Sequence, residues 1–161
     1  SIIFIEQEEK EMLRYFWSEG LVYYSEKEVT DWQEGIRESC QLLIEKKIIK
    51  ATYVEEIIKC IKMFGPYIIV APNVAMPHAS SQSDEVLGTA VSFTKLKSPV
   101  NFGDPEKKAQ LFFTLAAKDS TAHLKNIQRL SELLMKERVI DSLMATESIE
   151  DYLKVMRRYE S

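Results

Sequence analysis

The chain has 161 residues, of which 45% are hydrophobic and 29% are charged, with 5 Gly and 5 Pro. These values exclude a disordered or collagen-like protein and leave enough apolar side chains for a core. The net charge is -4, which argues against nucleic acid or an anionic membrane as a partner, because neutralising phosphates requires clustered cations. We expect one domain over residues 1–161, in which residues 1–24 could form an N-terminal helical extension.

The first part of the chain predicts mainly helices. Residues 2–20 indicate a short helix on the outside of the domain, and residues 21–24 indicate a strand. Residues 30–33 and 52–55 match capping boxes, in which two polar side chains satisfy the free amides at a helix start. Apolar residues recur at helical spacing after each box, and Gly65 and Pro66 end the second helix. Its predicted buried face consists of Tyr53, Ile57, Cys60, Ile61 and Phe64.

The middle of the chain predicts strands. Residues 67–71, 87–93 and 110–116 each indicate a strand. The last of these is almost uninterruptedly apolar, so we expect both of its faces to be buried. Residues 98–105 contain two prolines and a glycine and predict a turn-rich connection.

The rest of the chain predicts helices. One begins near Ser120, and another begins near Thr146 or Ser148. The apolar stripe expected on the first consists of Leu124, Ile127, Leu130 and Leu134. Helices before and after a central group of strands predict an α/β fold, with a sheet covered by helices on both faces.

Several kinds of site lack their sequence signature. The five glycines are scattered, so neither a P-loop nor a dinucleotide-binding loop can be built. The GxSxG elbow of serine hydrolases is absent. Neither of the two histidines has a cysteine or a carboxylate at ligand spacing. We therefore expect no metal and no cofactor.

The two cysteines, Cys40 and Cys60, form no CxxC pair and lie on apolar faces of predicted helices. We interpret them as core thiols in a reducing, cytoplasmic compartment. The alternative is a cysteine enzyme that uses one of them together with a histidine. Slow thiol alkylation under native conditions would argue against that alternative.

His78 is the first candidate for chemistry. Pro77 restricts the backbone directly before it, and Ala79, Ser80 and Ser81 leave space around the ring. A neutral imidazole offers a nitrogen lone pair as a nucleophile at neutral pH. The simpler alternative, which spacing alone favours, is a loop histidine that only bonds a carbonyl.

His123 is the second candidate. If Ser120 caps its helix, His123 lies in the first turn, where free amides and the helix dipole favour an anion. The same dipole disfavours an imidazolium, so we expect a neutral hydrogen-bond donor. The alternative is a histidine that simply faces solvent.

Residues 65–72 (GPYIIVAP) and 74–79 (VAMPHA) resemble the phosphohistidine motif of the mannitol/fructose-type EIIA proteins of the bacterial phosphotransferase system. Residues 99–103 and 111–119 resemble the segments that follow it in that family, and His123 matches the second histidine, 45 positions after His78. The resemblance covers roughly residues 30–159. The Gly-Pro-Tyr sequence at residues 65–67 is most similar to that of the ascorbate-specific branch of the family.

The resemblance implies a mixed sheet between helices and a phosphotransferase that carries phosphohistidine. It implies that His78 accepts phosphate from phosphorylated HPr and passes it to a cognate EIIB, which serves the membrane component EIIC. It implies that His123 helps to hold the phosphate. Many mannitol-type members of the family have an arginine shortly before the motif, near the phosphate. When this chain is compared with them without gaps, that position holds Lys62 instead. Helix amides and the hydroxyls of Ser80 or Ser81 could compensate.

Two points stay open at this level. EIIA-like domains also occur as regulatory modules, in which phosphorylation gates protein contacts, and this is the alternative function. The apolar N-terminal segment could form a homodimer contact. Neither the sugar nor the oligomeric state follows from the sequence.

Overall fold

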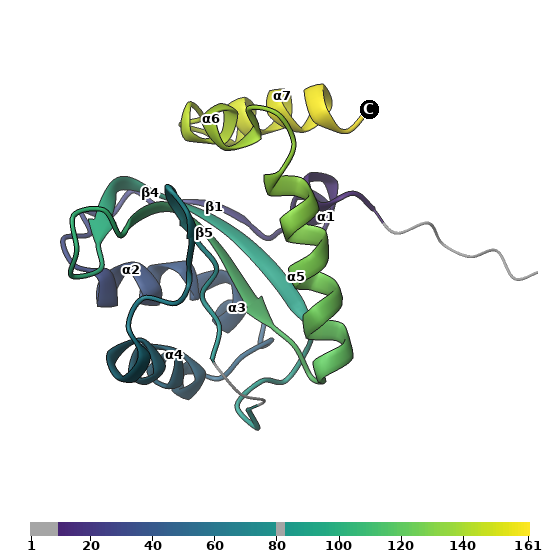
Figure 1. Cartoon of the computed structure of the whole chain (residues 1–161). Helices are drawn as coiled ribbons and strands as arrows, with labels where there is room; N and C mark the ends of the chain where they lie inside the picture. The colour runs from purple at the N-terminus through teal and green to yellow at the C-terminus, as the bar shows by residue number, and fades with distance from the viewer. Residues whose placement is uncertain (1–9, 80–82) are drawn as a thin grey trace, which may run out of the picture.

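The computed structural model describes residues 10–79 and 83–161. A mixed sheet forms its centre (Figure 1). In spatial order its strands are β1 (Val22–Tyr24), β4 (Ala90–Asn101), β5 (Lys108–Ala116), β3 (Asn73–Ala75) and β2 (Ile69–Ala71). The pairs β1–β4 and β3–β5 are parallel, whereas β4–β5 and β2–β3 are antiparallel.

Helices cover both faces of this sheet (Figure 1). One face carries α2 (Trp32–Ser39), α3 (Gln41–Glu45) and α4 (Ala51–Phe64). The other carries α1 (Met12–Ser18), α5 (Ser120–Leu134), α6 (Val139–Met144) and α7 (Ile149–Tyr159). In β5, Phe112 points into the first core while Leu111 and Phe113 point into the second, because successive side chains of a strand alternate. The predicted α/β fold and the doubly buried strand are confirmed.

Two strands differ from the sequence prediction. β4 begins at Ala90, three residues later than predicted, and continues to Asn101, through the first part of the predicted connection. Its pairing with β5 is irregular between Lys95 and Val100, and Pro99, which has no amide to donate, falls in that interval. β3 was not predicted, because three residues are too few to show an alternating pattern.

The helix start predicted at Ser148 is confirmed, since the Ser148 hydroxyl accepts from the Asp151 amide and caps α7, whereas the two predicted capping boxes were wrong by one or two residues. Asp31 caps α2 by accepting from the amide of Glu34 at 2.9 Å, and Thr30 lies outside the cap. α4 begins after Lys50 without a side-chain cap, and the Thr52 hydroxyl instead donates to Glu85. Several residues near a helix start can act as a cap, so the sequence predicts the presence of a helix start better than it predicts which residue is the cap.

Two residues assigned to buried stripes are exposed. Phe64 at the end of α4 is 62% exposed, and Leu124 in the first turn of α5 is 67% exposed. In contrast, Met12, Leu13 and Phe16 of α1 are buried against the second core. Among the described helices, none combines the length and the apolar character that crossing a bilayer would require.

Candidate functional site

The topology brings the two histidines together. β3 and β5 are parallel, so their carboxyl ends lie at the same edge of the sheet. His78 follows β3 by three residues, and His123 lies in the first turn of the helix that follows β5. The centroids of the two imidazole rings are 5.4 Å apart, and their planes are inclined by 57°. Both side chains are partly exposed, so a second molecule can approach them.

The segment around His78 is anchored to β5 on one side and to the residue before β2 on the other. The Met76 amide donates to the Ile68 carbonyl at 2.8 Å, and the Leu115 amide donates to the Pro77 carbonyl at 2.9 Å. The ring folds back over its own chain, with Nδ1 at 2.6 Å from the Met76 carbonyl oxygen. A carbonyl can only accept, so Nδ1 carries the proton in the neutral ring and Nε2 carries the lone pair. The backbone therefore determines which nitrogen of His78 keeps its lone pair.

His123 is placed by the cap of α5. The cap residue is Asp119 rather than the predicted Ser120, and its carboxylate accepts from the Ala122 amide at 2.8 Å. The His123 amide donates to the Asp119 carbonyl at 3.1 Å. The side chain therefore starts from a fixed helical turn beside the amino end of α5, where an anion is favoured.

Both imidazoles are held in the neutral form. Burial lowers the pKa of His78 most, the nearby His123 lowers it further, and the bond to the Met76 carbonyl opposes this. Burial also lowers the pKa of His123. Each ring therefore keeps a free nitrogen lone pair at neutral pH and loses it only on stronger acidification than an exposed histidine would need.

We predict that both imidazoles titrate below pH 6.5, the ordinary value for histidine. If His78 accepts phosphate, as the family resemblance implies, the phosphorylation rate should be flat from pH 8 to about pH 6.5 and fall below it, because protonation removes the lone pair of Nε2. An NMR titration of the ring nitrogens measures both midpoints, and the urea-unfolded chain supplies the reference. A midpoint at or above the reference for either ring would contradict the prediction.

The surroundings of the pair differ in part from expectation. Met76 and Pro77, which directly precede His78, are buried, and Met76 packs into the second core, so neither forms an exposed contact surface beside the ring. Lys62 is exposed in the last turn of α4 and lies within electrostatic range of Glu55. Ser80 and Ser81 lie outside the described residues. In the described parts of the chain, no three metal-ligating side chains gather at one place.

The cysteines lie in different environments. Cys40 is completely buried, and burial raises the pKa of its thiol to about 12, so it is a poor nucleophile. Cys60 is only half-buried, which differs from the predicted core position, and its thiol lies beside Tyr67. The burial of Cys40 argues against a cysteine enzyme that uses this thiol.

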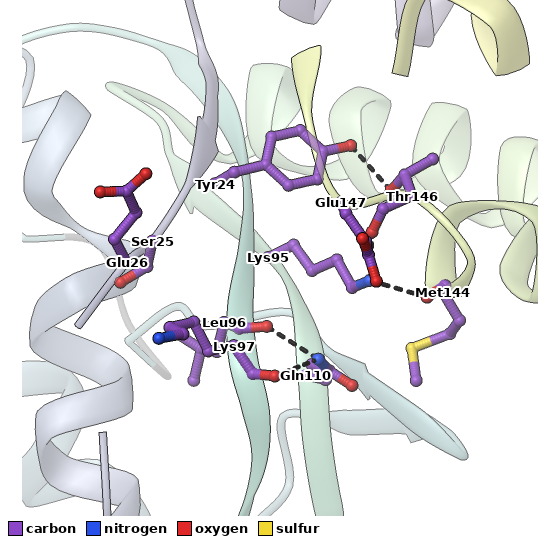
Figure 2. Close-up of a pocket in the computed structure, with 10 residues that line it drawn as sticks. All are labelled: Tyr24, Ser25, Glu26, Lys95, Leu96, Lys97, Gln110, Met144, Thr146 and Glu147. Atoms are coloured by element: carbon purple, nitrogen blue, oxygen red, sulfur yellow. Dashed lines mark hydrogen bonds between the residues drawn. The ribbon is translucent and has the colours of Figure 1, made fainter. Parts of the chain in front are cut away.

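A polar hollow of about 660 Å³ lies elsewhere on the molecule (Figure 2). Lys95 on its wall donates to the carbonyl oxygens of Met144 and Thr146 and so ties the end of α6 to β4. The Tyr24 hydroxyl donates to the Thr146 hydroxyl at 2.8 Å. Lys95 pairs with Leu111 of β5, whereas Leu115 of the same strand bonds Pro77 beside His78. The four-residue separation of these two positions of β5 places the hollow about 13 Å along the strand from the histidine segment.

Comparison with known proteins agrees with this geometry. Residues 16–159 match the family described as "Phosphoenolpyruvate-dependent sugar phosphotransferase system, EIIA 2". The chain belongs to this family. EIIA components are phosphotransferase proteins, so the predicted family and class of activity are confirmed.

Curated relatives and solved structures give the same assignment. The mannitol-specific cryptic phosphotransferase enzyme IIA component of Escherichia coli K12 is 36% identical over 80% of this chain and 86% of its own length. The ascorbate-specific PTS EIIA component of the same strain is 29% identical over 81% and 86%.

Two solved structures are similar in fold. The solution structure of the E. coli mannitol-specific cryptic enzyme IIA has a TM-score of 0.75 and 31% identity, covering 92% of this chain and 99% of that one. A complex of the mannitol enzyme IIA with phosphorylated enzyme IIB from E. coli has a TM-score of 0.70 and 25% identity, covering 84% and 94%.

Proposed function

We propose that this EIIA domain is a cytoplasmic phosphocarrier in which Nε2 of His78 accepts phosphate from phosphorylated HPr and passes it to a cognate EIIB. The observation that carries the proposal is the pair of neutral imidazoles 5.4 Å apart at one sheet edge, with Nδ1 of His78 on the Met76 carbonyl. The EIIA–EIIB complex among the similar structures supports an EIIB partner. Family membership supports HPr as the donor.

The transfer can be written for these atoms. The lone pair of His78 Nε2 attacks phosphorus as the P–N bond to the HPr histidine breaks, and a second displacement passes the group to EIIB. The Nδ1 proton stays on the ring, and its bond to the Met76 carbonyl stabilises the positive charge that the ring gains. Positioning and electrostatics are what phosphoryl transfer asks of a protein.

His123 has a supporting role in this proposal. From the amino end of α5 its ring can donate a hydrogen bond to a phosphoryl oxygen on His78. We predict that His123→Ala slows phosphorylation about 10- to 100-fold and leaves one phosphate per chain at long times, because the acceptor nitrogen remains. Quench-flow measurement with phosphorylated HPr tests this. Unchanged rates would remove His123 from the site.

The experiment that tests the function is discharge of the phosphorylated protein. Phosphate is loaded with phosphoenolpyruvate and the general carriers, and purified EIIB domains for L-ascorbate and for mannitol are then added. The Gly-Pro-Tyr motif at residues 65–67 favours the ascorbate EIIB as the partner, whereas the 36% identity to a mannitol-specific enzyme IIA favours the mannitol EIIB. Rapid transfer to either EIIB supports the proposal and names the branch. Loading without discharge to any EIIB would instead favour a regulatory module.

A further inference from the structure

Tyr67 contacts His78 in two ways. Its hydroxyl donates to the backbone carbonyl of His78. Its ring packs against the imidazole edge to face, with centroids 5.3 Å apart and planes inclined by 83°. Tyr67 itself is fixed three residues after the end of α4, where its amide donates to the Gly65 carbonyl at 2.8 Å. The hydroxyl therefore connects a helix end to the residue that carries the reactive nitrogen.

Tyr53 holds the other side of the same peptide. Its hydroxyl accepts from the Ala79 amide at 3.2 Å and donates to the Leu115 carbonyl at 3.1 Å. Tyr53 is 4% exposed and Ala79 is 8% exposed, so water cannot readily replace either bond. The peptide that joins His78 to Ala79 thus has its carbonyl bound by one tyrosine and its amide by another.

Both tyrosines stay protonated over the physiological range. Burial raises the pKa of Tyr53 to about 12. The pKa of Tyr67 is raised as well, mainly by burial and to a smaller extent by the neighbouring Cys60. Each hydroxyl therefore remains a donor whenever the imidazole is neutral.

We propose that Tyr67 and Tyr53 are positioning residues for phosphoryl transfer, which fix the His78–Ala79 peptide so that Nδ1 stays on the Met76 carbonyl and Nε2 stays turned toward the partner. This rests on the proposed role of His78. With Nδ1 bound two residues back and the following peptide bound on both sides, the ring has few alternative orientations. In-line transfer between two docked proteins is sensitive to such freedom, since a misplacement of about 1 Å can cost a hundredfold in rate.

The test uses three matched variants that each remove one hydroxyl. Tyr67→Phe keeps the ring contact with His78, and Tyr53→Phe keeps the core packing. Tyr24→Phe is the control, because its hydroxyl also donates a hydrogen bond, here to the Thr146 hydroxyl, but lies at the polar hollow on another part of the sheet. Thermal unfolding of all three variants measures how far each substitution lowers the unfolding temperature, so that a general loss of stability can be compared with the loss of rate.

The first readout is the nitrogen chemical shifts of His78 in the unphosphorylated protein. The native chain and Tyr24→Phe should show one tautomer, with the proton on Nδ1. Tyr67→Phe and Tyr53→Phe should show averaging between the two tautomers. The second readout is the single-turnover rate from phosphorylated HPr, where we expect about a tenfold loss for Tyr67→Phe at saturating HPr with an unchanged half-saturation concentration.

The outcomes separate this proposal from the one on which it rests. If Tyr67→Phe and Tyr53→Phe match Tyr24→Phe in both tautomer and rate, the positioning role is wrong. If the native protein takes no phosphate on His78, the proposed function fails, and the nitrogen shifts still decide whether the tyrosines orient the ring. A rate loss that merely follows the fall in unfolding temperature across all three variants would also overturn the positioning role.

Discussion

Replacing His78 with alanine is expected to abolish phosphorylation. The native chain should take up one phosphate from phosphorylated HPr, and the variant should react at least about a thousandfold more slowly, because the attacking nitrogen is gone. His123 cannot substitute, since its backbone is fixed in the first turn of α5 and a partner aligned on Nε2 of His78 would meet a different nitrogen at a different angle. Intact mass and acid-labile phosphate measure the result.

The matched control for this loss is His123→Ala, which removes the other imidazole from the same sheet edge. It should still end at one phosphate per chain. His78 is only partly buried, so its truncation should leave the fold intact, and circular dichroism with thermal unfolding checks this. Full labelling of His78→Ala, or loss of labelling in His123→Ala alone, would assign the acceptor role to another group.

The sequence identified both imidazoles but could not explain why they meet. Their proximity depends on the parallel pairing of β3 with β5, and β3 has only three residues. Local patterns of polarity carry no information about which strand lies beside which. The resemblance to the EIIA family supplied that relation, and the structure supplied its physical cause.

The residues that hold the His78–Ala79 peptide were harder to predict than His78 itself. Tyr53 was expected only as an apolar core residue, yet its hydroxyl joins Leu115 and Ala79, which lie 62 and 26 positions away. Such bonds become visible only once the chain is folded. The caps of α2 and α5 were displaced by one residue for a different reason, since Thr30 and Ser120 each stand next to an aspartate that caps equally well.

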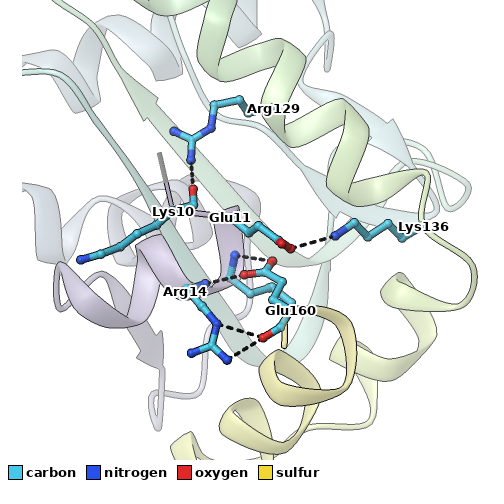
Figure 3. Close-up of polar contacts among 7 residues, drawn as sticks. Lys10, Glu11, Arg14, Arg129, Lys136 and Glu160 are labelled. Carbon is cyan, nitrogen blue, oxygen red and sulfur yellow. Dashed lines mark hydrogen bonds and ion pairs between the residues drawn. The ribbon is translucent and has the colours of Figure 1, made fainter. Parts of the chain in front are cut away.

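Stability offers a second large effect, at the contact between the two ends of the described chain (Figure 3). The buried carboxylate of Glu160 accepts from the amides of Leu13 and Arg14, each at 2.8 Å. These amides open α1, whose own N-cap residue Glu11 makes no side-chain bond to them. The backbone carbonyl of Glu160 accepts from the Arg14 guanidinium at 2.9 and 2.6 Å. Glu160 therefore caps α1 from the other end of the sequence.

We predict that Glu160→Gln lowers the free energy of unfolding by about 2 kcal/mol, and that Glu160→Ala lowers it by at least as much. A carboxylate offers an acceptor oxygen to each amide, whereas glutamine has one oxygen and would turn its own NH₂ group toward the second amide. Urea unfolding measures the change. Hydrogen exchange of the α1 amides should accelerate in the same variants, because that helix loses its cap.

The control is Glu11→Gln, which removes an exposed ion pair with Lys136 at 3.5 Å from the same region (Figure 3). An exposed pair of this kind contributes about 0.5 kcal/mol or less, so Glu11→Gln should leave the free energy of unfolding almost unchanged. If Glu160→Gln is equally mild, the carboxylate cap does not hold α1. In that case the apolar contacts of Met12, Leu13 and Phe16, together with the bonds of Arg14 to the Glu160 carbonyl and of Tyr152 to the Leu13 carbonyl, would suffice to join the N-terminal helix to the domain.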